Sequence, residues 1–254
     1  MGLRDNYVAL TKARILKELI QVHIVDISHE IEKFNIIQAA YVFGNSYSEF
    51  PEGTVHVLGI KSGSEKNQRY LAIEIEKQII LCPDNGIFTL FHDLGKPTTI
   101  KEIPKNSIEN NLFFVKDILI DQACKIIKDN TYFQSLPHAL NHRQILNYQP
   151  TSTSFTITGR CIYVDGYGNV ITNIKKSFFE ESRKGRSFTI FLPGLKIKKI
   201  SKDYEDVPEI NPLAIFNNAG YLEIAVNKGQ AKQLLFQRNF NSHNDFNLTI
   251  EFSE

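Results

Sequence analysis

The stretch Val164-Asp-Gly-Tyr-Gly-Asn-Val-Ile-Thr-Asn-Ile174 predicts two strands joined by a tight polar turn. Gly166 and Gly168 permit backbone angles that other residues resist, so the side chains beside them can point toward one place. Those side chains, from Asp165, Tyr167 and Asn169, are a carboxylate, an aromatic ring and an amide, which suit a small polar ligand with a flat ring. An ordinary hairpin explains the same spacing, and spacing alone favours the hairpin.

The turn lies in a half of the chain that is rich in short strands. Between residues 130 and 154 the periodicity weakens and two prolines occur, so we place a domain boundary near residue 152. This gives an α/β domain over 1–152 and a smaller β-rich domain over 153–254. The strands expected in the second domain are Phe155–Val164, Val170–Ile174, Phe188–Leu192, Leu213–Phe216 and Tyr221–Val226.

The first domain alternates helical and strand-like segments, which predicts an α/β layer structure with a mostly parallel central sheet. Val22–Ile27 is a nearly continuous apolar run, as in a strand covered on both faces. A turn at Pro83–Gly86 precedes a short helix over Ile87–Phe91. The other helices are expected over Val8–Leu19, Ile36–Tyr47 and Phe114–Lys128. A further strand is expected over Thr54–Ile60, and two more, Tyr70–Glu76 and Gln78–Leu81, look like a hairpin.

Composition excludes several classes of protein. The 254 residues carry 29 basic and 28 acidic side chains without a long basic run, so we expect no nucleic-acid or membrane partner. Cys82, Cys124 and Cys161 are odd in number and lack metal-like spacing, which predicts reduced thiols and no disulfide framework. No apolar run is long enough for a signal peptide or a membrane span, so we expect a cytoplasmic protein.

No familiar catalytic motif is complete. The chain lacks a phosphate-binding glycine loop, His-Glu-x-x-His and Gly-x-Ser-x-Gly, and we expect no metal site. His23 and His56 alternate with aliphatic residues in strand-like runs, where structural histidines are common. His29 and the loop Lys61–Ser64 each follow an expected strand end, where ligand-binding loops often lie, although a solvated loop explains Lys61–Ser64 equally well.

The order of six segments resembles one family, the S-adenosylmethionine (SAM) hydroxide adenosyltransferases, relatives of the fluorinating and chlorinating enzymes that displace methionine from SAM. Each segment is a weak signal, but six in order are specific. They are Gly2-Leu-Arg-Asp-Asn-Tyr-Val8, Ile24-Val-Asp-Ile-Ser-His-Glu-Ile31 with Phe34-Asn-Ile36, Phe50-Pro-Glu-Gly-Thr-Val-His-Val57, Pro83-Asp-Asn-Gly86, Tyr163–Ile174 and Asn217-Asn-Ala-Gly-Tyr-Leu-Glu-Ile-Ala225.

The resemblance implies a barrel-like C-terminal domain and a homotrimer whose sites lie between subunits. It also implies that SAM is a substrate, with no separate cofactor. By position, Asp5 and Tyr7 would lie near the methionine end of the ligand, and Phe34 would stack in the adenosyl pocket. Asp165, Tyr167 and Asn169, in the polar turn that we call the elbow, would hold the amino-acid and adenine groups. Asn218 falls where the family has a serine or a similar residue. The implied ligand-binding set is Asp5, Tyr7, Phe34, Asp165, Tyr167, Asn169 and Asn218.

The catalytic positions of the family are substituted in this chain. Hydroxide-using members place an aspartate, an arginine and a histidine around the attacking water, where this sequence has Lys61, Gln68 and Phe114. The usual means of orienting and deprotonating water is therefore missing. A slipped loop could bring Arg69 back to the arginine position. Lys61 could be a neutral base or could hold an anionic nucleophile, or the site could have lost its chemistry.

Two functions follow as alternatives. The first is an enzyme that displaces methionine at the 5′ carbon of SAM, and the second is a non-catalytic protein that binds or senses an adenosyl ligand. A purely structural trimeric subunit is a third reading. Family members begin with an apolar strand ending in Thr-Asp-Phe, and Met1 stands at the phenylalanine position. We therefore expect the first domain to lack its first strand, and in-frame genomic sequence before Met1 to encode one.

Overall fold

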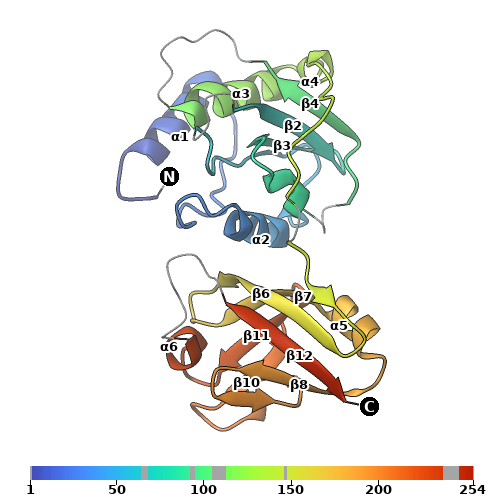
Figure 1. Cartoon of the computed structure of the whole chain (residues 1–254). Coiled ribbons are helices and arrows are strands. Elements are labelled where there is room, and N and C mark those ends of the chain that lie inside the picture. The colour runs from blue at the N-terminus through green and yellow to red at the C-terminus, as the bar shows by residue number, and fades with distance from the viewer. Residues whose placement is uncertain are drawn as a thin grey trace. The chain divides into compact units, whose positions relative to one another are not determined.

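The computed structural model describes residues 2–63, 68–91, 95–104, 113–145, 148–236 and 246–253 (Figure 1). The chain forms two compact units, Met1–Ile145 and Leu146–Glu254. Each unit has its own sheet and its own hydrophobic core.

The sheet of the first unit has four strands in the order β1-β3-β2-β4, and it is mixed. The expectation of a mostly parallel sheet is not confirmed, because only the pair β1–β3 is parallel among the described residues. Glu76 and Lys77 have φ of 46° and 61° and form a two-residue turn, which joins consecutive strands in antiparallel fashion. The strands are β1 (Val55–Val57), β2 (Tyr70–Ile75), β3 (Gln78–Pro83) and β4 (Thr99–Ile103).

The predicted strand at Val22–Ile27 is wrong. The segment lies outside every helix and strand, and the side chain of Val25 is largely exposed. A strand persists only where a neighbour satisfies its backbone N–H and C=O groups. Within the described residues no strand pairs with this segment, although its apolar composition is that of a buried strand.

Helices cover both faces of the four-stranded sheet (Figure 1). On one face, Leu119 and Ala123 pack against Tyr70 and Leu81 of the strands. On the other face, the Tyr47 hydroxyl donates to the carbonyl oxygen of Ile75 at 2.6 Å. The helices are α1 (Tyr7–Glu18), α2 (Ile36–Tyr47), η1 (Ile87–Leu90), η2 (Val115–Ile120, of π type), α3 (Asp121–Lys128) and α4 (Tyr132–Ser135).

His56 of β1 is a structural histidine, as the sequence pattern indicates. Its ring lies 5.1 Å from the rings of Phe43 and Phe50, and its Nε2 is 2.7 Å from Gln78 Oε1. Burial lowers the pKa of His56, so the ring stays neutral inside the aromatic cluster.

The second unit is an antiparallel sheet of eight strands that nearly closes into a barrel, as expected. The strand order is β10-β11-β7-β6-β12-β8-β9, so β10 and β9 are the two edges of the sheet. A bridge between Ile200, in the segment after β9, and Ala214 of β10 links these two edges. The strands are β5 (Thr151–Ser152), β6 (Thr156–Val164), β7 (Val170–Lys175), β8 (Ser187–Leu192), β9 (Leu195–Ile197), β10 (Pro212–Phe216), β11 (Tyr221–Val226) and β12 (Asn247–Ser253), with helices α5 (Lys176–Arg183), η3 (Tyr204–Asp206) and α6 (Ala231–Phe236).

Phe179 of α5 anchors the core of the second unit. It is fully buried, and its ring centroid lies 5.1 Å from Phe188, 5.5 Å from Phe216 and 6.3 Å from Phe252. Replacing it with alanine leaves a cavity, so Phe179→Ala is expected to lower the free energy of unfolding by about 3–5 kcal/mol. Urea unfolding measures this loss. Phe155→Ala is the control, because that side chain is exposed; similar losses in both variants would contradict the assignment.

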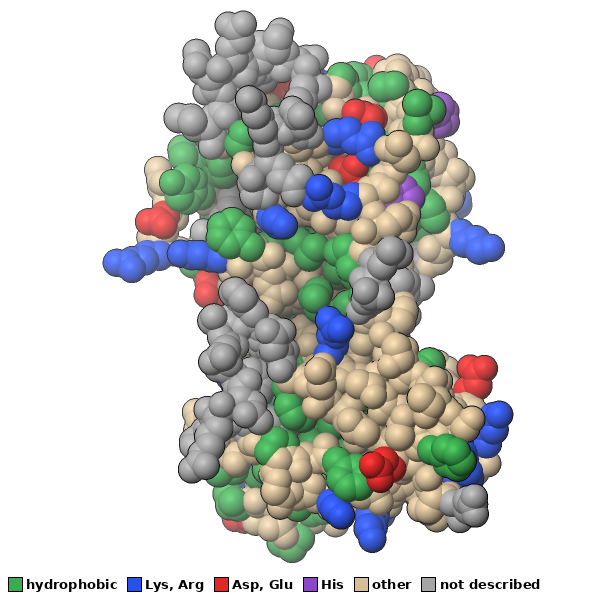
Figure 2. All heavy atoms as spheres, in the orientation of Figure 1, with side chains coloured by type: hydrophobic (Ala, Val, Ile, Leu, Met, Phe, Trp, Pro, Cys, Tyr) green, Lys and Arg blue, Asp and Glu red, His purple; other side chains and the backbone are tan. Residues whose placement is uncertain are grey.

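The surface charges and the three cysteines do not indicate a particular function. On the face seen in Figure 2, basic and acidic side chains of the described residues are interspersed. No helix in the described part of the chain is long and apolar enough to cross a membrane. Cys82, Cys124 and Cys161 are buried and form no disulfide, and burial raises the pKa of the Cys82 thiol.

Candidate functional site

The loop after β1 holds Lys61 in a fixed and unusual backbone conformation. Lys61 has φ of 50°, a left-handed conformation that β-carbon sterics disfavour. The carbonyl oxygen of Ile60 accepts a hydrogen bond from Asn85 Nδ2 at 3.0 Å, and that of Ser62 accepts one from the Tyr70 hydroxyl at 2.5 Å. Both neighbours of Lys61 are therefore tied to the buried part of the unit.

The turn after β3 lies beside this loop. Because β1 and β3 are parallel, their carboxyl ends meet at one edge of the sheet, the usual place for a ligand in α/β proteins. Asn85 is buried and joins the two loops, since its Oδ1 accepts from the backbone N–H of Ile87 at 3.1 Å while its Nδ2 reaches Ile60. Gly86 has φ of 93°, and a β-carbon added there would lie 2.6 Å from Ile145 Cγ1.

Phe114 lies against the Lys61 loop, and Gln68 lies just before β2. A β-carbon added to Gly63 would come within 2.3 Å of Phe114 Cδ2, so ring and loop are in direct contact. Gln68 is 4% exposed, and its Nε2 donates to the carbonyl oxygen of Arg69 at 2.9 Å. Its Oε1 has no hydrogen-bond partner within the described part of the chain. An aromatic ring thus packs on the Lys61 loop, and a buried neutral amide precedes β2.

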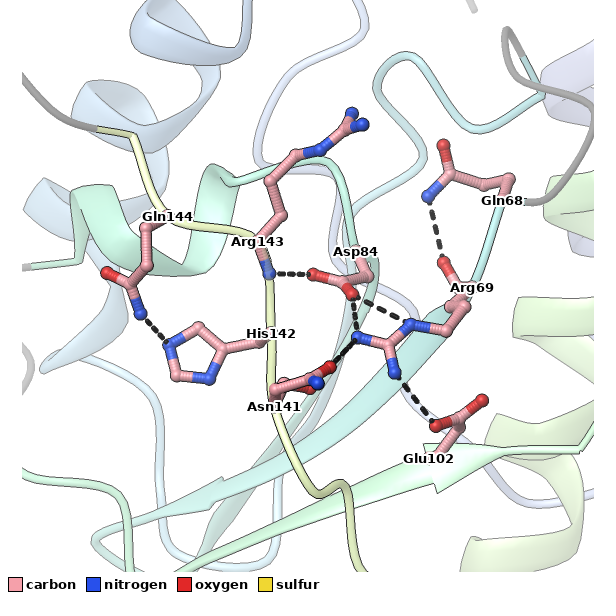
Figure 3. Close-up of polar contacts among 8 residues, drawn as sticks. All are labelled: Gln68, Arg69, Asp84, Glu102, Asn141, His142, Arg143 and Gln144. Atoms are coloured by element: carbon pink, nitrogen blue, oxygen red, sulfur yellow. Dashed lines mark hydrogen bonds and ion pairs between the residues drawn. The ribbon is translucent and has the colours of Figure 1, made fainter.

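Arg69 is committed to a structural network (Figure 3). Its guanidinium donates to Asp84 Oδ2 from Nη2 at 2.5 Å and from Nε at 3.1 Å. It also donates to Glu102 at 3.3 Å and to the backbone and side-chain oxygens of Asn141 at 2.9 Å. The other oxygen of Asp84 accepts from the backbone N–H of Arg143 at 2.7 Å. With these donors in use, Arg69 does not take over the position of the missing arginine.

The N-terminal candidates lie on the surface of the first unit. Asp5 is exposed in the turn before α1, and Tyr7, 46% exposed, begins that helix. The Tyr7 ring meets Phe113 edge-on at 5.2 Å, next to Phe114 in the chain. Phe34 has φ of 65° and is 67% exposed, a conformation and exposure that packing within the unit does not explain.

His29 takes part in a small ion-pair group. Its Nε2 lies 3.1 Å from Asp26 Oδ1, and Lys12 contacts Asp26 Oδ2 at 2.5 Å. The hydrogen bond from Lys12, followed by the contact with His29, lowers the pKa of the Asp26 carboxyl. His29 is thereby oriented by neighbours in its own unit.

In the second unit, Asp165 shapes the elbow that the sequence pattern marks. Its Oδ1 accepts from the backbone N–H groups of Tyr167 and Asn169 at 2.9 Å each, and its Oδ2 accepts from Asn169 Nδ2 at 3.0 Å. Gly168 has φ of 82°, and a β-carbon there would lie 2.9 Å from Gln230 Cβ. The elbow is therefore a rigid hairpin turn that leaves the Tyr167 ring 80% exposed.

Two residues that the sequence patterns did not single out, Tyr204 and Glu223, form a further hydrogen-bonded group in the second unit. Glu223 Oε1 accepts from the Tyr204 hydroxyl at 2.8 Å, and Oε2 accepts from Asn217 Nδ2 at 3.3 Å. Burial is the first cause that raises the pKa of both residues; for Tyr204 the bond to Glu223 comes next, and the charge of Asp165 is a smaller contribution for each. The signal was present, since a lone glutamate inside the apolar strand Tyr221–Val226 requires buried polar partners.

The sequence also matches known proteins over both units. Residues 1–136 match the SAM hydroxide adenosyltransferase N-terminal domain, and residues 159–239 match the C-terminal domain of the same family. The chain belongs to the SAM hydroxide adenosyltransferase family. The family that the six sequence segments predicted is thus confirmed.

Curated relatives match this family member over nearly its whole length. The (R)-S-adenosyl-L-methionine hydrolase of Methanocaldococcus jannaschii is 29% identical over 92% of this chain and 88% of its own. The hydrolase of the same name from Thermus thermophilus is 25% identical over 92% of each chain. A solved structure of an uncharacterized conserved protein from Thermotoga maritima superposes with a TM-score of 0.83, at 26% identity over 98% of this chain and 96% of that one.

Membership of this enzyme family confirms the expectation of an enzyme related to SAM hydrolases and adenosyltransferases. Lys61, Gln68 and Phe114, where the resemblance implies the catalytic residues of the family, lie within the range that matches the N-terminal domain. Both groups of candidate residues, around Lys61 in the first unit and around Asp165 in the second, fall within the matched ranges.

Proposed function

We propose that this protein catalyses nucleophilic displacement at the 5′ carbon of SAM by water or an anion, giving adenosine or a 5′-substituted adenosine together with methionine. The match to both family domains, with hydrolase relatives that cover 92% of the chain, carries this proposal. The family match favours an enzyme over a non-catalytic adenosyl-ligand binder.

The chemistry requires little beyond positioning. A new bond forms between the nucleophile and the 5′ carbon while the carbon–sulfur bond breaks, and its electron pair neutralises the sulfonium. With water as nucleophile, one proton is released to solvent. The main task of the protein is to align a desolvated nucleophile with that carbon.

Lys61 sets the electrostatics of the proposed site. A protonated lysine ~4 Å from the sulfonium is repelled by roughly 1 kcal/mol in water, and more where water is excluded. An anion held by Lys61 between the two cations removes this repulsion and places a nucleophile in the site. We therefore favour an anionic nucleophile, hydroxide or halide, over neutral water.

The remaining parts of the proposal concern assembly and recognition. Asp5, Tyr7, Phe34, Asp165, Tyr167, Asn169 and Asn218 form the proposed ligand set, and SAM needs no separate cofactor. A homotrimer would build each site from the first domain, 1–152, of one subunit and the second domain, 153–254, of its neighbour. A cytoplasmic location fits a substrate of central metabolism.

Incubation of the full-length protein with SAM, with and without chloride, tests the proposal. Chromatography is expected to show methionine with adenosine, and 5′-chloroadenosine if chloride is used. Absence of all three products rejects the reaction. Calorimetric binding of SAM or adenosine without turnover would instead indicate the non-catalytic alternative.

A further inference from the structure

Glu223 is a buried acid whose carboxylate accepts hydrogen bonds from two uncharged donors, Tyr204 and Asn217. It is 3% exposed in the middle of β11. Tyr204 donates to one carboxylate oxygen and Asn217 to the other. Asp165 is the remaining ionisable group that acts on it, and no basic side chain of the described residues does so. A buried charge without a cationic partner is costly, so its retention needs a reason.

Asn217 connects this carboxylate to the turn that carries Asn218. The Oδ1 of Asn217 accepts from the backbone N–H groups of Ala219 and Tyr221, at 3.1 Å each. Because its Nδ2 is held by Glu223, the amide cannot rotate without losing bonds at both ends. Gly220 closes the turn with φ of 75°. The Asn217 amide thus holds the turn around Asn218 together with the backbone bonds Asn217 N–Tyr221 O and Gly220 N–Asn217 O.

Tyr204 is held by the same carboxylate. Its ring is 41% exposed while its hydroxyl is bonded to Glu223. The pKa of Tyr204 is raised by burial and by this bond, with a further contribution from Asp165. The phenol therefore stays protonated and donates to Glu223 across the neutral pH range.

We propose that the ionised carboxylate of Glu223 is a positioning element for ligand recognition in the second unit. It holds Asn217, and through it the Asn218 turn, together with the Tyr204 hydroxyl. The inference rests on the proposed function, because the elbow and Asn218 bind ligand only if the protein recognises an adenosyl compound. Protonated Glu223 has a hydroxyl hydrogen that competes with one donor, so the arrangement loosens in acid.

The pH dependence of ligand affinity distinguishes a positioning role of Glu223 from a purely structural role. Burial raises the pKa of Glu223 above its ordinary value of 4.5, so the group protonates at a higher pH than a typical glutamate. Ligand affinity is expected to rise with pH as Glu223 ionises. Its contribution to stability has the opposite sign: it is fully present below pH 4.5 and is lost as pH rises through the folded-state pKa.

Calorimetry with adenosine and with SAM tests the proposal on the full chain. In Glu223→Gln, one amide N–H faces a donor, so affinity at about pH 8 is expected to fall about tenfold. The pH dependence between about pH 8 and about pH 5 should also disappear. Glu251→Gln, an exposed glutamate on β12, is the matched control and should behave as wild type. Wild-type affinity with an unchanged pH profile in Glu223→Gln would overturn the proposal.

A ligand-free measurement keeps this test separate from the proposed function. The backbone amides of Ala219 and Tyr221 should titrate by NMR with the ionisation of Glu223 in the wild type, and not in Glu223→Gln. If the wild type binds neither compound, the proposed function fails, and these titrations alone decide the positioning role. Amides that do not follow Glu223 would refute it.

Discussion

Asp84→Asn is expected to lower the free energy of unfolding of the first unit by about 2–4 kcal/mol. The Asp84 side chain is 5% exposed, and both oxygens accept hydrogen bonds, one from Arg69 and the other from the backbone N–H of Arg143. An amide presents N–H to one of these donors whichever way it is turned. The expected loss is below that of a fully buried pair, because the Arg69 side chain is 33% exposed.

Hydrogen exchange of the β2 and β3 amides measures this effect in the first unit alone. Glu52→Gln is the control, since Glu52 pairs with Lys77 on the surface and such pairs contribute at most about 1 kcal/mol. A loss in Asp84→Asn no larger than in this control would show that the network does not hold the unit together. Unchanged exchange in the second unit is expected for both variants.

Introducing the catalytic residues that the family resemblance implies is expected to raise adenosine release from SAM by about 10²-fold, the range of a positioned acid–base group, because activated water then replaces the anion held by Lys61 as nucleophile. The variant combines Lys61→Asp, Gln68→Arg and Phe114→His. An aspartate tolerates the left-handed backbone at position 61 better than lysine does, and it removes a positive charge near the sulfonium. A histidine at 114 would lie against the Lys61 loop, where the phenylalanine ring lies now.

Initial rates of adenosine release, with kcat and KM determined separately, measure the gain. Lys184→Asp makes the same charge change at another left-handed lysine, with φ of 51°, at the end of α5, and it should leave the rate unchanged. Turnover equal to wild type in a variant that keeps its melting temperature would show that Lys61, Gln68 and Phe114 do not line the reacting centre.

Local patterns predicted most of the regular structure. Apolar alternation identified β6 and β8, which have one face on the barrel core, whereas β7, β10 and β11 were recognisable as short strands buried along most of their length. The same reasoning failed at Val22–Ile27, since an apolar run cannot reveal whether a neighbouring strand is present. The hairpin of β2 and β3 was expected and is present, but β4, which pairs antiparallel with β2, was missed.

The site was less predictable than the fold. The glycine pattern located the Asp165 elbow, but only the structure shows that the carboxylate is bonded within its own turn. Arg69 is adjacent to Gln68 in sequence, and its commitment to Asp84, Glu102 and Asn141 depends on side chains from distant segments. Glu223 and Tyr204 meet only after β11 and η3 have packed.

The near closure of the eight-stranded sheet has a consequence for behaviour at high concentration. Bridging Ile200 to Ala214 leaves the second unit with little open strand edge onto which another chain can add. In the described part of the first unit, β1 pairs on one side only, and the apolar Val22–Ile27 segment has no strand partner. Aggregation should therefore begin in the first unit, and solubility engineering should place charged residues or proline there and leave the barrel unchanged.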